Sequence, residues 1–352
     1  MNSFGSKISS GRGVVMGAAI LFIMFFHLQS GHFGWWSDFC NCYGLWGVDA
    51  FMFVSGYGIA HSLRSWGRGQ AGGKGLGEFY RKRLLRILPV CVVSGTLFYF
   101  MAEPAQEGMK AMLLQVTGMD MWYVRVILLC YLFSPLFLCL MRRWRSWWLM
   151  LGLLVAVELL LWLSIELKPA HFPMNLYATT VCWGLARLPA YLMGLFVAEK
   201  CAADAEQVPD KASGGVWTWR LWLPLAAVGS LAFSLVARWL FSTGQGFWRS
   251  DYWDLMPLAG LVFALPVLCA GVGLCLQLLP QWLLRAPVAV LEWCGRHSLE
   301  LYVVHLPLYP IVARSGVDAA WYPYVAMGLS ALLACFLHQM VAEFRRFSPV
   351  KR

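Results

Sequence analysis

Apolar residues in this chain gather in long continuous runs, and polar residues gather in the short stretches between them. The runs reach about 18 residues or more, which is the length that a helix needs to cross the hydrocarbon of a bilayer. Short alternating strands, the pattern of a transmembrane barrel, are not visible. The pattern therefore predicts an all-α fold, a polytopic transmembrane helical bundle in a lipid bilayer.

About ten apolar runs are predicted to be membrane spans. In the ninth run Gly295 interrupts the pattern, so this helix is predicted to begin either with the run or later, near Ser298. The longest polar stretch, 201–218, is short, so residues 1–352 are predicted to form a single integral membrane domain. The predicted spans are 14–29, 46–63, 84–101, 121–141, 147–165, 179–199, 221–241, 255–279, 288–313 and 321–344.

Basic residues are distributed unevenly among the loops. Most Lys and Arg residues fall in alternate loops, including the cluster from Arg81 to Arg86 and both ends of the chain. Because positive charge next to a span stays on the cytoplasmic side, both termini are predicted to be cytoplasmic. The opposite loops hold only Lys110, Lys168, Arg249 and Arg314.

The composition agrees with a membrane protein and narrows the class of function. Hydrophobic residues make up 60% of the chain and charged residues 13%, about half the charge of a soluble domain. The net charge of +10 lies mostly in loops beside spans, which argues against nucleic acid as a partner. No Cys/His spacing matches a zinc site, so no metal is predicted.

The first candidate for chemistry is His27, at the outer end of the first predicted span. Polar groups at membrane depth are costly and are usually functional. A neutral imidazole accepts a hydroxyl proton near neutral pH, so His27 is a candidate general base. The alternative is a histidine that only bonds a neighbouring helix.

Asp49 and Ser55 lie in the second predicted span. Asp49 is near its outer end, as His27 is in the first span, and an Asp that orients a His is a recurring catalytic arrangement. The alternative is that Asp49 sits in the headgroup region. Ser55 is followed by Gly56 and Gly58, and such small-residue surfaces usually mean close helix packing. We expect packing for the glycines and leave the role of Ser55 open.

Arg83 and Arg86 stand out within the basic cluster that precedes the third span. Basic residues beside a span mostly serve orientation. These two, however, share one helical face at i, i+3, and apolar residues follow Arg86 directly. Two guanidinium groups on one face suit a phosphate-bearing ligand.

Two further polar residues lie deep within spans. Arg187 is well inside the sixth span and is expected to face a cavity or a carboxylate. His305 lies in the middle of the ninth run, two residues before a proline that loosens the helix. Both are candidates for lining a substrate pathway or channel.

These stretches together resemble the acyltransferase-3 family of integral membrane acyltransferases, in its short branch without an appended soluble domain. Each stretch alone is weak, but together they follow the family's order and cover nearly the whole chain. The matching segments are 17–27, 47–57, 79–89, 122–131 with Pro135, 187–194 and 295–305.

The resemblance implies a ten-helix bundle that moves an acyl group, usually acetyl, from cytoplasmic acyl-coenzyme A to a hydroxyl of a carbohydrate or lipid-linked glycan. It implies that His27 is the essential histidine and that Arg83 and Arg86 are the paired arginines. Asp49, Ser55, Trp122, Tyr131 and His305 match recurring family positions of less certain role.

The chain departs from the family pattern at two positions. A basic residue usually stands eleven positions before the histidine, where this chain has Met16, and the nearest base is Arg12, one turn earlier. Many members also carry a glutamate five residues after the tryptophan of helix 4, where this chain has Ile127.

The resulting hypothesis is a multi-pass O-acyltransferase of the bacterial inner membrane. His27 is expected to be the base, oriented by Asp49, and acetyl-coenzyme A or another acyl-coenzyme A is expected to be the donor. One alternative is a transporter or lipid-linked glycan exporter without thioester chemistry, and another is a scaffold for glycan assembly.

Overall fold

The computed structural model describes residues 3–28, 39, 43–64, 75–101, 113–114, 116–119, 121–144, 146–166, 177–206, 215–242 and 260–347. All regular structure within these ranges is helical. The α-helices are α1 (Phe4–Leu28), α3 (Trp46–Ser62), α4 (Leu76–Met101), α6 (Trp122–Arg143), α7 (Trp147–Glu166), α9 (Trp183–Glu206), α10 (Gly215–Ser242), α12 (Ala264–Leu278), α13 (Gln281–Arg296), α14 (Ser298–Arg314) and α15 (Tyr322–Phe347). A π-helix, Ala178–Cys182, leads into α9, and a 3₁₀ helix, Gly260–Phe263, leads into α12.

A helix lies over every predicted span, apart from residues 29 and 255–259, which fall outside the described ranges. Among the described helices, six are long and apolar enough to cross a membrane. The chain is therefore a multi-pass membrane protein, and the part that the structure describes is helical throughout its regular structure. The number of ten spans stays a prediction. So does the orientation of the termini. Of the basic residues in the opposite loops, Lys110, Lys168 and Arg249 lie outside the described residues.

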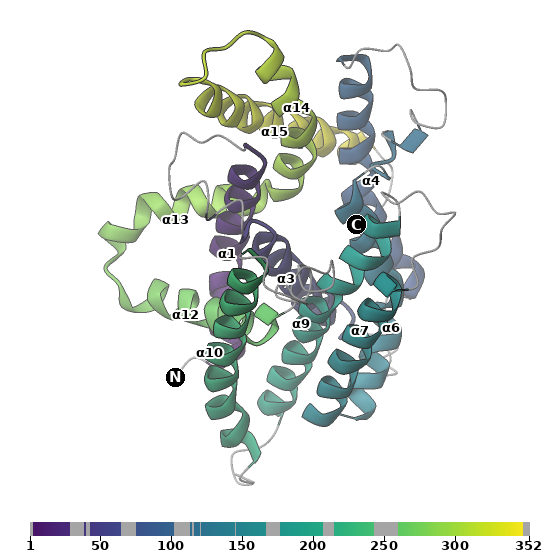
Figure 1. Ribbon diagram of the computed structural model, residues 1–352, viewed down its shortest axis with the longest axis vertical. Coiled ribbons are helices and arrows are strands. Elements are labelled where there is room, and N and C mark those ends of the chain that lie inside the picture. The colour runs from purple at the N-terminus through teal and green to yellow at the C-terminus, as the bar shows by residue number, and fades with distance from the viewer. Residues whose placement is uncertain are drawn as a thin grey trace.

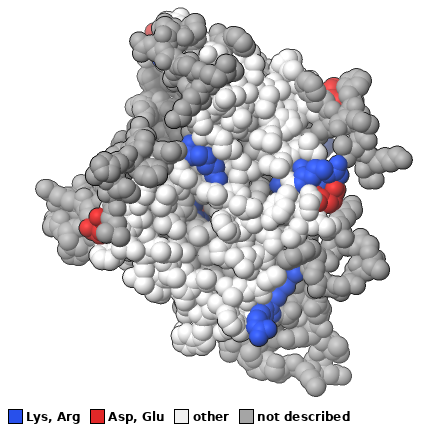
Figure 2. All heavy atoms as spheres, turned by 90° about the vertical axis from the view of Figure 1, so that its right-hand side faces the viewer, with Lys and Arg blue, Asp and Glu red and all other residues white. Residues whose placement is uncertain are grey.

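The outer surface of the bundle has the apolar character that lipid requires. Large apolar side chains on several helices are exposed, among them Trp148 at 81%, Leu136 at 65% and Leu332 at 68%. Figure 2 shows one face of the molecule, on which charged side chains are few and scattered among uncharged ones. In a bilayer, lipid chains would cover these apolar side chains, so the side chains would not be exposed to water.

The ninth apolar run is divided into two helices. α13 ends at Arg296, and α14 begins at Ser298, as the alternative reading of Gly295 predicted. Gly295, one residue before the end of α13, lies against α1, where a Cβ would clash with the backbone oxygen of Gly13. The expectation of one continuous helix over 288–313 is therefore wrong.

α3 and α9 share the most extensive helix–helix contact in the described bundle. A Cβ at Gly56 would clash with the carbonyl of Tyr191, and a Cβ at Gly194 would clash with the carbonyl of Phe53. Small residues let two backbones approach in this way, so the packing predicted for Gly56 is confirmed. This contact places Asp49 of α3 beside Arg187 of α9.

α1 lies among α12, α13, α14 and α3. In Figure 1, α1 and α3 run through the middle of the bundle, with α12 and α13 on one side and α6 and α7 on the other. This central position brings the polar residues of α1 toward those of α3 and α14. The candidate site is built from these three helices together with α4 and α6.

Candidate active site

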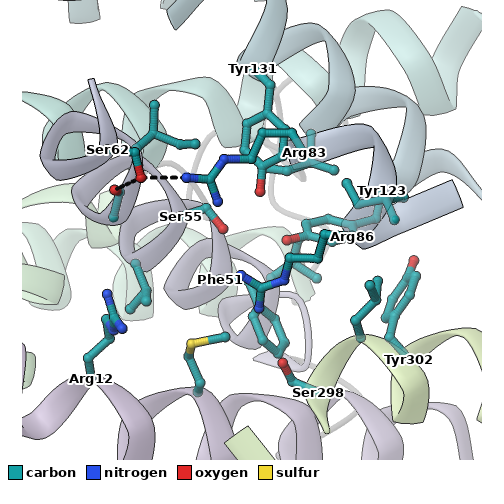
Figure 3. A pocket seen from close by; sticks show the side chains of 18 of the residues that line it. Arg12, Phe51, Ser55, Ser62, Arg83, Arg86, Tyr123, Tyr131, Ser298 and Tyr302 are labelled. Carbon is teal, nitrogen blue, oxygen red and sulfur yellow. Dashed lines mark hydrogen bonds between the residues drawn. The ribbon is translucent and has the colours of Figure 1, made fainter. Parts of the chain in front are cut away.

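A cavity of about 300 Å³ lies among five helices and holds three arginines in its wall (Figure 3). α1 provides Arg12, Met16 and Ile23; α3 provides Val48, Phe51, Val54, Ser55, Gly58, Ile59 and Ser62; α4 provides Arg83, Arg86 and Ile87; α6 provides Tyr123, Ile127 and Tyr131; α14 provides Ser298, Leu299 and Tyr302. We call it the arginine cavity. It brings together four of the predicted site residues, namely Ser55, Arg83, Arg86 and Tyr131.

Arg83 is held with its guanidinium partly unsatisfied. Its Nη2 donates to the hydroxyl of Ser62 at 2.5 Å, and its guanidinium lies over the rings of Phe79 and Tyr131 at 5.5 and 5.8 Å. Its buried Nε has no hydrogen-bond partner among the described residues. No described carboxylate lies within salt-bridge distance of Arg83, so its charge is available to an anionic ligand.

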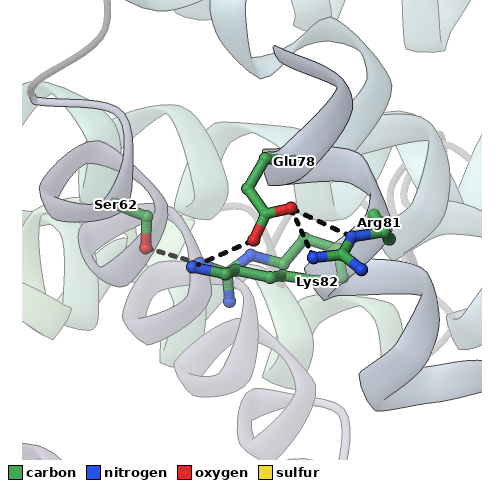
Figure 4. Close-up of polar contacts among 5 residues, drawn as sticks. Ser62, Glu78, Arg81 and Lys82 are labelled. Carbon is green, nitrogen blue, oxygen red and sulfur yellow. Dashed lines mark hydrogen bonds and ion pairs between the residues drawn. The ribbon is translucent and has the colours of Figure 1, made fainter. Parts of the chain in front are cut away.

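Glu78 is the carboxylate that pairs with two of the basic residues of α4. Its carboxylate accepts hydrogen bonds from Arg81 at 2.9 and 2.6 Å and lies 3.5 Å from Nζ of Lys82 (Figure 4). The hydrogen bond from Arg81 is the main reason that the pKa of Glu78 is lowered from its usual value. Arg81 and Lys82 therefore share the Glu78 carboxylate at the exposed start of α4, whereas Arg83, on another face, lines the cavity.

Arg86 and Arg12 enter the cavity from different helices. Arg86 follows Arg83 by one turn, as its i, i+3 spacing predicted, and its guanidinium lies near Phe51 in Figure 3. Arg12 of α1 lines the same cavity as Met16, the position at which the family usually has a basic residue. A charge on Arg12 thus reaches the region that a base at position 16 would serve.

Ser55 lies between two tyrosines of α6. Its side chain lines the cavity together with those of Tyr123 and Tyr131. The ring of Tyr131 also lies beneath the Arg83 guanidinium. Ser55 and Tyr131 therefore belong to the polar wall beside the arginines.

Asp49 has a partner, but the partner is not His27. Its Oδ2 accepts a hydrogen bond of 2.7 Å from Nη1 of Arg187, and both side chains are buried. The expectation that Asp49 orients His27 is wrong, because the α3–α9 contact turns the carboxylate toward α9. The expectation that Arg187 faces a carboxylate is confirmed, and neither residue lines the arginine cavity.

His27 pairs instead with His305 of α14. Nε2 of His305 lies 3.1 Å from Nδ1 of His27, and each Nδ1 also lies 2.9 Å from the carbonyl oxygen four residues earlier, at Leu301 and Ile23 respectively. His305 is fully buried and His27 is half-buried. Neither histidine lines the arginine cavity, but each lies one turn beyond a residue that does, since Ile23 precedes His27 and Tyr302 precedes His305.

Trp122 lines a second cavity of about 300 Å³. Its wall is formed by Ser94, Gly95, Phe98, Met121, Trp122, Tyr302, Leu306 and Pro307. α4 and α14 line both cavities, the first nearer their N-terminal ends and the second farther along. Tyr302 belongs to both walls, and its ring lies 5.7 Å from that of His305.

Tyr302 was not among the sequence candidates. The signal that could have found it is its spacing, because a residue three positions before a candidate histidine shares its helical face. Its aromatic neighbour Tyr123, at 5.2 Å between ring centroids, could not be found in this way, since it comes from another helix.

Comparison with known proteins adds one finding. A family model described as an acyltransferase domain, acyltransferase-3, matches residues 15–340. The matched range contains every predicted site residue, whereas Arg12 lies just before it. No curated protein and no solved structure matches the chain.

Proposed function

This chain belongs to the acyltransferase-3 family, and on that premise we propose that it moves an acyl group from acyl-coenzyme A to a hydroxyl of a sugar or glycan precursor. Acetyl is the proposed group. The observation that carries the proposal is the arginine cavity, since Arg83, Arg86 and Arg12 gather three cationic groups inside a membrane acyltransferase, one helical turn from the positions of His27 and His305 on α1 and α14.

The donor is proposed to bind with its phosphates on the arginines. Guanidinium groups bind phosphate through charge-assisted hydrogen bonds, and Arg83 has no described carboxylate to compete. A cavity of about 300 Å³ is at the small end of ligand pockets. We therefore place the acyl-bearing arm of the donor inside it and the nucleotide outside, toward the N-terminal end of α4.

The acceptor is proposed to enter from the second cavity. Its lining includes the rings of Phe98, Trp122 and Tyr302, and aromatic faces with a few polar groups are typical of ligand pockets. Tyr302 is common to both cavities and adjoins His305. Donor and acceptor would thus approach the histidine pair from opposite sides of one tyrosine.

The proposed chemistry is direct transfer with His27 as the general base. The imidazole accepts the hydroxyl proton while the hydroxyl oxygen attacks the thioester carbonyl carbon. As the tetrahedral intermediate collapses, the carbon–sulfur bond breaks, and the leaving thiolate takes the proton from the imidazolium to become free coenzyme A. A positioned base typically contributes about 10²–10⁴ in rate.

The proposed setting is the bacterial inner membrane, with about ten spans and both termini in the cytoplasm. In that orientation the basic start of α4 faces the cytoplasmic pool of acyl-coenzyme A. His27 then lies in the outer half of the bilayer. This arrangement requires the acyl group to pass along the bundle from the arginine cavity to the histidines.

The deciding experiment measures thioester cleavage by the purified protein in lipid nanodiscs. With acetyl-coenzyme A and a membrane glycan extract, we expect free thiol to appear together with acetylated glycan, and His27→Ala to lower both rates by about 10²-fold or more. His61→Ala is the matched control, since His61 is exposed and lines neither cavity. Equal rates for wild type and His27→Ala would sink the mechanism, and solute flux without thiol release would favour a transporter.

A further inference from the structure

The contact between His27 and His305 joins two side chains that are far apart in the sequence. Their ring centroids are 5.0 Å apart, and His305 has the rings of Tyr302 and Tyr309 at 5.7 and 5.4 Å. A second imidazole therefore occupies the place beside His27 that a carboxylate often occupies beside a catalytic histidine. Because Asp49 is bonded to Arg187, it does not fill that role.

The hydrogen bonds of His305 determine which of its nitrogens carries a proton. Its Nδ1 lies 2.9 Å from the carbonyl oxygen of Leu301, and a carbonyl oxygen only accepts. Nδ1 is thus the N–H nitrogen. In the neutral ring the other nitrogen is a bare acceptor, so the lone pair of Nε2 faces His27.

The same reasoning assigns the proton of His27. Its Nδ1 lies 2.9 Å from the carbonyl oxygen of Ile23 and 3.1 Å from Nε2 of His305. Both neighbours are acceptors, so Nδ1 must donate. A bare Nδ1 would place its lone pair against the carbonyl oxygen of Ile23. The remaining nitrogen, Nε2, is then unprotonated and has no hydrogen-bond partner among the described residues.

We propose that His305 is a positioning residue, which holds His27 in the Nδ1–H tautomer and accepts that hydrogen bond more strongly when His27 becomes an imidazolium. The proposal rests on the acyl transfer proposed above. Nε2 of His27 takes the hydroxyl proton of the acceptor and returns it to the thiolate of coenzyme A, while the Nδ1 proton stays between Ile23 and His305. An uncharged orienting group also avoids the cost of a second carboxylate at membrane depth.

Three substitutions separate hydrogen bonding from packing. In His305→Gln the side-chain carbonyl oxygen can reach the position of Nε2. The side chain of Asn is one methylene shorter, so in His305→Asn the amide reaches only the position of Nδ1, near the carbonyl of Leu301. His305→Leu fills the space without any acceptor. We expect His305→Gln to keep kcat within a few-fold of wild type, and the Asn and Leu variants to lose about 10- to 100-fold. KM for acetyl-coenzyme A should change less than about two-fold in all three.

A structural role for His305 would give a different pattern. If Gln, Asn and Leu lowered kcat equally in proteins of equal thermal stability, or if His305→Leu kept full activity, the proposal would be overturned. A rise in KM with unchanged kcat would also overturn it, since that would assign His305 to donor binding.

A second measurement does not depend on activity. ¹⁵N-histidine labelling and solid-state NMR in lipid report the protonation of each ring nitrogen, and the His27→Gln spectrum identifies the His27 signals among those of the seven histidines. We expect a protonated Nδ1, an unprotonated Nε2 and a Nδ1–H coupling to His305. A protonated Nε2 on His27 would refute the assignment. If wild type cleaves no thioester while this tautomer is present, the proposed function fails and the pairing stands.

Discussion

At the scale of single residues, the direction in which a basic side chain points from its helix decides its partner, and its charge alone does not. Arg81 and Arg83 lie two positions apart on α4, yet Arg81 is bonded to Glu78 and Arg83 lines the arginine cavity. Successive residues of a helix point in different directions, so neighbours in a basic cluster serve different partners. A count of basic residues cannot separate the two roles.

Arg83→Gln is expected to raise KM for acetyl-coenzyme A about tenfold or more. A hydrogen bond to a charged group contributes about 1.5–3 kcal/mol, and every 1.4 kcal/mol is tenfold in affinity. The measurement is the initial rate of thiol release against donor concentration. Arg81→Gln is the matched control, and equal KM values for the two variants would contradict the donor site.

Arg12 and Met16 permit a test by compensation. Both line the cavity from the same helix, one turn apart. Arg12→Gln is expected to weaken donor binding, measured by isothermal titration with coenzyme A. The double variant Arg12→Gln/Met16→Lys should recover part of the affinity, because it returns a cation to the same wall. If the double variant is folded but recovers no affinity, Arg12 does not take the role of the basic residue that the family usually has at position 16.

At the scale of elements, the packing of α9 against α3 fixes the position of α3, which lines the arginine cavity. Two glycines bring the backbones together, and the buried ion pair between Asp49 and Arg187 crosses the same contact. Oδ1 of Asp49 and two nitrogens of Arg187 lack hydrogen-bond partners among the described residues. The pair is therefore sensitive to the loss of one partner, since the remaining charge would be buried and uncompensated.

Removing one member of this pair is expected to cost more than removing both. Arg187→Leu leaves the Asp49 carboxylate alone in the bundle, at a cost of about 3–5 kcal/mol. The double variant Asp49→Leu/Arg187→Leu should be more stable than either single variant. Thermal unfolding of the four proteins in one detergent forms a double-mutant cycle. Additive losses would show that the two residues do not interact.

At the scale of the whole molecule, the arginine cavity lies near the basic starts of helices and the histidines lie farther along the same bundle. This order has a functional meaning only if the basic ends face the cytoplasm. The described exposed surface is apolar enough for lipid, but an apolar surface does not distinguish one orientation from the other.

Reporter fusions test the orientation directly. A C-terminal green fluorescent protein is expected to be fluorescent, and a C-terminal alkaline phosphatase inactive, because basic loops retain the termini in the cytoplasm. Fusions after residue 110, in a predicted outer loop, should give the reverse result. An active phosphatase at the C-terminus would invert the proposed path of the acyl group.

The apolar runs were enough to predict an all-α membrane bundle, because a span needs only length and hydrophobicity. The i, i+3 spacing of Arg83 and Arg86 likewise predicted their shared face, since one helix sets it. The partner of Asp49 was mispredicted. Asp49 and His27 lie at similar depth in the membrane, so His27 was the expected partner of Asp49. Similar depth, however, does not determine which neighbouring helix a side chain faces.

Local pattern thus determined the helices, the basic cluster and the candidate histidine, because each depends on residues within one turn or one span. Tertiary structure alone decided the pairings across helices. It joined Asp49 to Arg187, His305 to His27 and Arg12 to the wall of Arg83 and Arg86. Such contacts arise from the rotation of each helix about its axis, which is set by glycine contacts and side-chain packing between segments distant in the sequence.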